Sequence, residues 1–152
     1  MAFLLDSGIL LRLANPKDTR HGEVRSAVTL LGDREEPLHV ATQNIAEFCN
    51  VISRPVENNG LGKTPQEAMR FVQEDIEPIC AVLIEIDLAY AEFKRLVATY
   101  SVVGKQVHDA RLVAMMLAWQ IENILTLNDR DFRRYEPEGI KVVTPAELIA
   151  SS

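Results

Sequence analysis

Short apolar runs alternate with longer segments of helical periodicity along the whole chain. The apolar runs predict five strands, at about residues 2–5, 38–41, 82–86, 124–126 and 140–143. The segments between them predict helices over about residues 7–13, 18–31, 42–52, 64–76, 87–100 and 107–119, with a last helix after residue 144. Strands alternating with helices predict an α/β fold in which helices cover both faces of a mostly parallel sheet of four to five strands.

One predicted helix, over residues 107–119, contains no Gly or Pro and is apolar on more than one face. Asp109 precedes Leu112, Val113 and Met116 by three, four and seven residues, so it shares their face and should point towards the interior. A charged group in that position needs a cap, a counter-charge or a metal. Backbone N–H groups at the start of the helix could satisfy this carboxylate, and Asp109 alone does not separate that interpretation from a metal site.

The composition is that of an ordinary globular protein, with 47% hydrophobic and 25% charged residues, and 152 residues predict a single domain. The first apolar run has no basic segment before it, and no apolar stretch is long enough to span a bilayer, so we expect a cytoplasmic protein without a membrane segment. Cys49 and Cys80 have neither a CxxC spacing nor nearby His partners, which predicts free thiols and excludes a zinc site.

A net charge of −6 argues against a protein that binds nucleic acid over its whole surface, because such binding depends on Lys and Arg displacing counterions. A local basic patch is compatible with this charge. Several cations flank the acids of the second half of the chain, namely Lys105, Arg111, Arg130, Arg133 and Arg134. Taken one at a time, each is equally well explained as part of a solvated face.

Acidic and amide side chains recur where the predicted strands end. Asp6 directly follows the first strand, Glu47 lies in the helix after the second, and Asp109 opens the helix that leads to the fourth. Asn128, Asp129 and Asp131 follow the fourth strand. Because ligands of parallel α/β sheets bind beyond the carboxyl ends of the strands, we expect these side chains to meet there.

Clustered carboxylates repel one another unless a cation neutralises them. Oxygen ligands without nearby His or Cys favour Mg²⁺ or Mn²⁺. Such an ion can acidify a bound water and stabilise the charge that develops on a phosphodiester under attack. The acids therefore predict a metal-dependent phosphoryl-transfer site.

Several segments in this order resemble the PIN-domain family, and in particular the VapC-type ribonuclease toxins of bacterial and archaeal toxin–antitoxin pairs. The resemblance covers about residues 2–148. It is carried by LLDSGILLR (residues 4–12), QNIAEF (43–48), RP (54–55), NGLG (59–62), GKQVHDA (104–110) and TLNDRDF (126–132). It implies a three-layer α/β/α sandwich and a Mg²⁺- or Mn²⁺-dependent endoribonuclease. It also implies a homodimer that is inhibited by a VapB-like antitoxin.

The resemblance assigns roles by position. Asp6 and Asp109 become the principal metal ligands, and Glu47 becomes the third acid, which holds a metal-bound water or acts as a base. The fourth acid falls among Asn128, Asp129 and Asp131. Asp131, beside Phe132, is the first choice, and Asn128 is the alternative as a neutral ligand.

Two hydroxyl residues have supporting roles in this assignment. Thr126 is expected to orient Asp6 or a metal-bound water through a hydrogen bond, and Ser7 keeps the hydroxyl that the family has after its first Asp. Gly8 departs from the family, which usually has Asn there, so an amide hydrogen bond is lost. His108 is expected to be a packed residue that orients its neighbours.

Two other functions compete with the nuclease. A phosphoaspartyl phosphatase would need a second Asp where Gly8 stands, and a receiver domain would need a Lys at the end of a late strand, whereas Lys141 lies at the start of one. A catalytically silent PIN fold acting as a dimeric binding module is the stronger alternative. For the dimer we expect contacts from the helices over residues 64–76 and 88–100.

Overall fold

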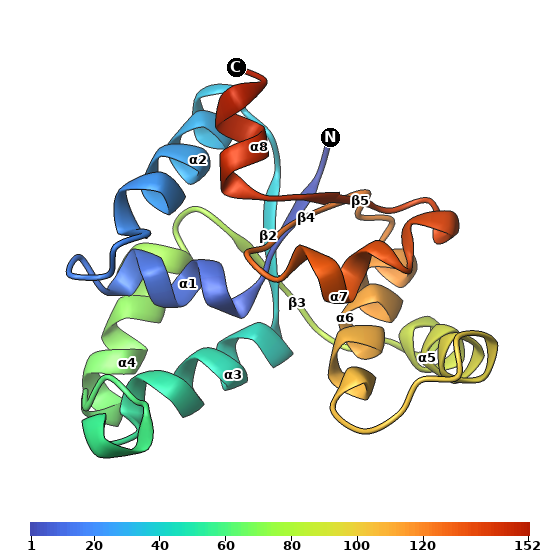
Figure 1. Cartoon of the computed structure of the whole chain (residues 1–152), viewed down its shortest axis with the longest axis horizontal. Coiled ribbons are helices and arrows are strands. Elements are labelled where there is room, and N and C mark those ends of the chain that lie inside the picture. The colour runs from blue at the N-terminus through green and yellow to red at the C-terminus, as the bar shows by residue number, and fades with distance from the viewer.

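A five-stranded parallel sheet runs through the middle of the molecule (Figure 1). The computed structural model describes all 152 residues. The strands are β1 (Phe3–Leu5), β2 (Leu38–Ala41), β3 (Ala81–Leu83), β4 (Asn123–Leu125) and β5 (Lys141–Val143), in the spatial order β3-β2-β1-β4-β5. All four pairings are parallel, which confirms the predicted sheet.

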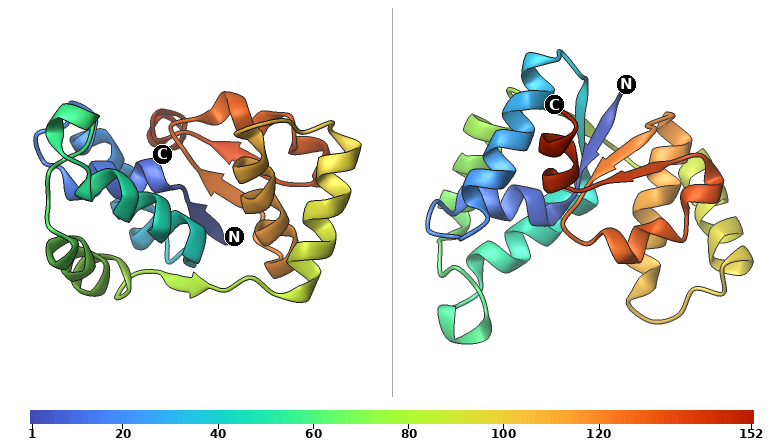
Figure 2. Two further views of the ribbon diagram at one scale, coloured as in Figure 1. Left: turned by 90° about the horizontal axis from the view of Figure 1, so that it is seen from below. Right: turned by 45° about the horizontal axis from the view of Figure 1, so that its top comes forward.

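Helices cover both faces of the sheet, as the two views in Figure 2 also show. One side carries α1 (Ser7–Ala14), α2 (His21–Asp33), α3 (Thr42–Ser53), α4 (Pro65–Phe71) and α8 (Pro145–Ala150), and the other carries α5 (Asp87–Thr99), α6 (Gln106–Trp119) and α7 (Asp129–Arg133). Shorter turns are the 3₁₀ segments η1 (Val56–Asn58) and η3 (Glu136–Glu138) and the π-helical segment η2 (Val72–Ile76) that continues α4. This is the three-layer α/β/α sandwich predicted from the sequence.

The central strand β1 separates two hydrophobic cores. Phe3 and Leu5 belong to the core beneath α1, α2 and α3, whereas Leu4 belongs to the core beneath α5 and α6. Successive side chains of a strand point to opposite faces, so a strand that is covered on both sides must be apolar throughout. All three residues of β1 are buried for this reason.

The register of β1 and β4 brings two polar residues together at the carboxyl edge of the sheet. Leu5 is paired with Leu125, so the residues that follow, Asp6 and Thr126, leave the two strands side by side. Both chain termini lie at the opposite edge (Figure 1). The polar ends of β1 and β4 thus define one edge of the molecule.

Several boundaries differ from those predicted. The first helix, α1, continues to Ala14, and Asp6 caps it because its carboxylate accepts a hydrogen bond from the Ser7 N–H. The second helix begins at His21, after a hydrogen-bonded turn between Asp18 and His21. The strand β3 ends at Leu83, the last residue that β2 pairs with, because β3 is an edge strand and has a neighbour on one side only.

The structure also bears on the cysteines and on the expected lack of a membrane segment. Cys49 and Cys80 are free thiols, and burial raises the pKa of the Cys80 thiol to about 12. None of the helices combines the length and hydrophobicity needed to cross a lipid bilayer.

Candidate active site

Asp6 lies at the centre of the carboxyl edge and is fixed from two sides. Its side chain is 8% exposed. The Ser7 N–H donates to Asp6 Oδ1 at 2.9 Å, and the Thr126 hydroxyl donates to Asp6 Oδ2 at 2.7 Å. Burial raises the pKa of the Asp6 carboxyl, the two hydrogen bonds oppose that rise, and the charge of Asp131 adds to it. The hydrogen bond expected between Thr126 and Asp6 is therefore present.

Thr126 also links Asp6 to the residues after β4. The Asn128 N–H donates to Thr126 Oγ1 at 2.9 Å, and Asn128 Nδ2 donates to Asp131 Oδ2 at 2.6 Å. Thr126 is fully buried, whereas Asn128 and Asp131 are exposed. Asn128 thus holds Asp131 in place, which fits a supporting role for its amide.

Glu47 enters the site from α3. The side chain is half-buried, and its Oε1 atom is shielded from solvent without a hydrogen-bond partner. Burial and then the charge of Asp6 raise the pKa of the Glu47 carboxyl, while Gln43, His108 and Arg111 nearby oppose the rise. A buried carboxylate oxygen with no donor is costly in the free protein.

Asp109 enters from the first turn of α6, and its carboxyl is half-buried. Burial, followed by the charges of Asp131, Asp6 and Glu47, raises the pKa of the Asp109 carboxyl to about 7. No hydrogen bond offsets these contributions. The carboxylate is therefore not satisfied as a helix cap, and the charges of Asp131, Asp6 and Glu47 are near enough to act on it.

Gln43 connects the two helices that carry Glu47 and Asp109. It is 8% exposed, and its Nε2 atom donates to the His108 carbonyl oxygen at 2.9 Å, across 65 residues of sequence. The sequence analysis missed this residue, although its position one turn before Glu47 places both on one face of α3. The side chain of His108 is exposed, so the expectation of a packed histidine is wrong. Its backbone carbonyl accepts the Gln43 hydrogen bond, and its side chain opposes the rise in the pKa of Glu47.

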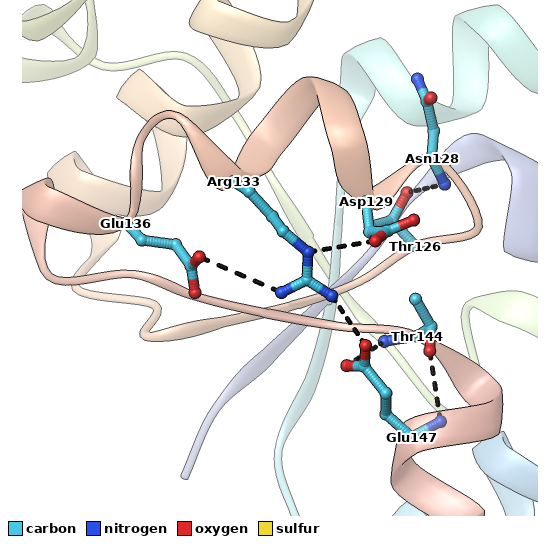
Figure 3. A network of polar contacts seen from close by, with 7 residues as sticks. All are labelled: Thr126, Asn128, Asp129, Arg133, Glu136, Thr144 and Glu147. Atoms are coloured by element: carbon cyan, nitrogen blue, oxygen red, sulfur yellow. Dashed lines mark hydrogen bonds and ion pairs between the residues drawn. The ribbon is translucent and has the colours of Figure 1, made fainter.

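Asp129 belongs to a different network (Figure 3). Arg133 Nε lies 3.0 Å from Asp129 Oδ2, and the same guanidinium reaches Glu147 at 2.7 Å and Glu136 at 4.0 Å. Glu147 also forms a reciprocal cap with Thr144 at the start of α8. Arg133 therefore joins α7 to the last helix and holds Asp129 within this network, while the charge of Asp131, two residues later, acts on Asp6 and Asp109.

The four acids match a metal ion in their chemistry but not in their arrangement. The four acids offer oxygen ligands only, which suits a hard divalent cation, and Glu47 Oε1 lacks a partner within the protein. No three His, Cys, Asp or Glu side chains converge closely enough in the structure to hold one ion together. The donor set thus fits the ion in type and charge without forming a closed coordination shell.

No protein-family model and no curated protein sequence matches this chain. Solved structures do. VapBC-1 from nontypeable Haemophilus influenzae has a TM-score of 0.70 at 12% identity, covering 96% of this chain and 99% of that chain. DNA-bound VapBC from Salmonella typhimurium has a TM-score of 0.67 at 17% identity, covering 95% and 98%.

A third similar structure is VapC20 from Mycobacterium tuberculosis, a toxin described as cleaving the sarcin-ricin loop. Its TM-score is 0.58 at 18% identity, and the match covers 80% of this chain and 86% of that chain. These similarities establish the fold. The chain has the PIN-domain fold of the VapC toxins, as the sequence resemblance predicted.

Proposed function

We propose that this chain is a Mg²⁺- or Mn²⁺-dependent endoribonuclease and the toxin of a toxin–antitoxin pair. The observation that carries the proposal is the mutual perturbation of Asp6, Glu47 and Asp109, whose pKa values are all raised by burial and by neighbouring acids. An uncompensated negative cluster of this kind is a typical functional site. Its position at the carboxyl edge of a PIN-domain fold, similar to that of the VapC20 toxin described as cleaving the sarcin-ricin loop, supports RNA as the substrate class.

Asp6, Glu47 and Asp109 would hold the cation, after side-chain rotation towards a common point. The ion, when bound, would polarise the attacked phosphoryl group and acidify a water. Thr126 and the Ser7 N–H keep both oxygens of Asp6 in fixed directions, so this ligand is oriented in advance. The Glu47 Oε1 atom has no partner and a raised pKa, which favours it as acceptor of the proton from the attacking water.

The remaining assignments follow from the same proposal. Asp131 supplies the fourth negative charge and Asn128 holds it. Solved structures with this fold include VapBC and FitAB complexes, which supports a VapB-like antitoxin as partner. We further propose a homodimer that works in the cytoplasm.

The test is cleavage of a panel of single-stranded and structured RNAs with Mg²⁺, with Mn²⁺ and with EDTA. Asp6→Asn and Asp109→Asn remove one charge each while keeping the side-chain size, and each should lower the cleavage rate at least about 100-fold. Arg34→Gln, a charge change ahead of β2 at the opposite edge of the sheet, is the matched control and should cleave normally. Cleavage that persists in EDTA, or that is equal in all four proteins, would refute the nuclease.

The alternative is a catalytically silent PIN fold that serves as a dimeric binding module. The lack of three converging ligands and the presence of Gly8 favour this alternative. A binding module would show no metal-dependent cleavage, yet would still bind its antitoxin. The same cleavage assay, run beside an antitoxin-binding assay, separates the two functions.

A further inference from the structure

A small pocket lies beside the acidic cluster, between α6 and α7. It is lined by Gln106, Asp109, Arg130, Asp131, Arg134 and Tyr135. Two of the proposed site acids therefore form one part of its wall and two arginines form another. Carboxylates that could hold a metal ion and arginine side chains thus line the same pocket. An oxyanion such as a phosphate could contact both the metal ion and the arginines there.

Arg134 is held in position by neutral groups. Its Nη1 atom donates to Gln106 Oε1 at 3.2 Å, and its Nη2 atom donates to the Tyr100 carbonyl oxygen. Its guanidinium carbon lies 5.8 Å and 5.5 Å from the ring centres of Tyr100 and Tyr135. These contacts fix the guanidinium without neutralising its charge.

The absence of ion pairs distinguishes the pocket arginines from others nearby. Arg133 is paired with Asp129 and Glu147, and Arg111 is paired with Glu85. None of the ion pairs in the structure involves Arg130 or Arg134. In a chain with a net charge of −6, two arginines at one pocket that have no ion-pair partner are available for an external anion.

Tyr135 provides an independent observation at the same pocket. Its side chain is fully buried, and its hydroxyl has no hydrogen-bond partner in the protein. Buried hydroxyls are normally paired, and this unpaired hydroxyl belongs to a residue that lines the pocket, which favours a group that arrives from outside. Two guanidinium groups and one phenol thus belong to residues that line the pocket. The only acids among the lining residues are Asp109 and Asp131.

We propose that Arg130 and Arg134, with the Tyr135 hydroxyl, bind an RNA backbone phosphate adjacent to the one that is cleaved. This inference rests on the proposed nuclease function, because that function places the scissile phosphate at Asp109 and Asp131. Phosphate contacts position a nucleic acid without reading its sequence. The pocket would therefore set the register of the strand over the acids, and the choice of cleavage sequence would come from elsewhere.

The test measures the binding of a fluorescent single-stranded RNA by the full chain carrying Asp109→Asn, which blocks the proposed cleavage and removes one repelling charge. Arg130→Gln and Arg134→Gln should each weaken binding about ten-fold. Each should also lower the slope of log affinity against log salt by about 0.7, the value for one lost contact to a single strand. Arg34→Gln is the matched control and should leave both quantities unchanged.

Conservative variants guard against a folding defect. Arg134→Lys keeps the charge and should recover part of the affinity, and Tyr135→Phe should weaken binding while preserving the packed ring. Inorganic phosphate at constant ionic strength should not displace the RNA. Displacement by a few millimolar phosphate would make the ligand a free anion and overturn the RNA assignment.

Cleavage by the unmodified chain, measured in parallel, keeps the two proposals separable. If the arginine variants lose affinity and salt dependence while the unmodified chain cleaves nothing, the phosphate site stands and the nuclease fails. If the unmodified chain cleaves RNA but Arg130→Gln and Arg134→Gln bind like Arg34→Gln, the phosphate site is wrong. Absence of RNA binding by the Asp109→Asn chain would also overturn it.

Discussion

The Thr126 hydroxyl donates a hydrogen bond of 2.7 Å to Asp6 Oδ2, between residues that are 120 positions apart in the sequence. The parallel register of β1 and β4 makes this contact, because both residues follow directly on paired leucines. This hydrogen bond favours the ionised form of Asp6 and so opposes the rise in its pKa that burial causes. The orientation of the central carboxylate is thus a property of the sheet itself.

Replacing this donor should affect stability and activity together. Thr126→Val keeps the shape but leaves Asp6 Oδ2 without a donor, so the free energy of unfolding at pH 8 should fall by about 1–3 kcal/mol. RNA cleavage should fall about ten-fold. Thr126→Ser keeps the hydroxyl and is the control. Denaturant unfolding curves that coincide for the Val variant and the unmodified protein would contradict the role assigned to Thr126.

The raised pKa of Asp109 makes stability depend on pH. A carboxyl whose folded pKa is about 7 and whose unfolded pKa is near 4 binds more protons in the folded state between these values. Its stabilising effect is therefore complete below about pH 4 and is lost as the pH rises through about 7. Without added metal, the protein should be less stable at pH 8 than at pH 5.

Asp109→Asn should remove much of the stability loss between pH 5 and pH 8. At pH 8 the variant should be more stable than the unmodified protein by on the order of 1 kcal/mol, allowing for solvent screening, or about 3 °C in Tm. The two proteins should melt at similar temperatures near pH 5. Thermal denaturation in EDTA at both pH values measures this, and a less stable variant at pH 8 would mean that Asp109 is not repelled by its neighbours.

Gly60 should be far more sensitive to substitution than an exposed helical glycine. A Cβ at Gly60 would lie 2.0 Å from the backbone oxygen of Arg54, within a loop tied by a 2.8 Å hydrogen bond from the Gly62 N–H to the same oxygen. Gly60→Ala should therefore cost about 1–3 kcal/mol of unfolding free energy. Gly22, in α2, has no atom within 4 Å of its Cβ position, and Gly22→Ala should stabilise by about 0.5–1 kcal/mol. Urea unfolding that ranks the two variants equally would disprove this contrast.

The proposed homodimer should depend on the apolar surface beside β3. Leu88 and Tyr90 of α5 are 51% and 59% exposed, and Met69 of α4 is 40% exposed. Figure 2 shows β3 running between these two helices. Light scattering during size-exclusion chromatography should give twice the chain mass of 17.0 kDa, and Leu88→Glu should give a monomer, whereas Val56→Glu should not. A monomeric unmodified protein would rule out this dimer.

The sequence predicted the fold well because burial on both faces leaves a plain signal. The run Phe3–Leu5 had to be apolar throughout, and its abrupt end at Asp6 marked the edge where the acids meet. Alternation of strands and helices then required parallel pairing. The prediction that Asp6, Glu47 and Asp109 lie towards this edge of the sheet could therefore be made from the sequence alone.

Details that depend on side-chain direction could not be predicted in this way. Asp129 and Asp131 are two residues apart on a short helix, and only the structure shows that Arg133 engages the first and Asn128 the second. Gln43 was missed because its partner is a backbone carbonyl 65 residues away. Contacts between side chains and distant backbone atoms leave no periodic pattern in the sequence.

A divalent ion shared by Asp6, Glu47 and Asp109 is the basis of the proposed nuclease. Titration of the protein with Mn²⁺ at pH 8, followed by the electron paramagnetic resonance signal of free Mn²⁺, tests this without any RNA. We expect saturable binding that Asp6→Asn and Asp109→Asn each weaken at least ten-fold, and that Arg34→Gln leaves unchanged. Mn²⁺ binding that is absent, or equally strong in all four proteins, would contradict this expectation.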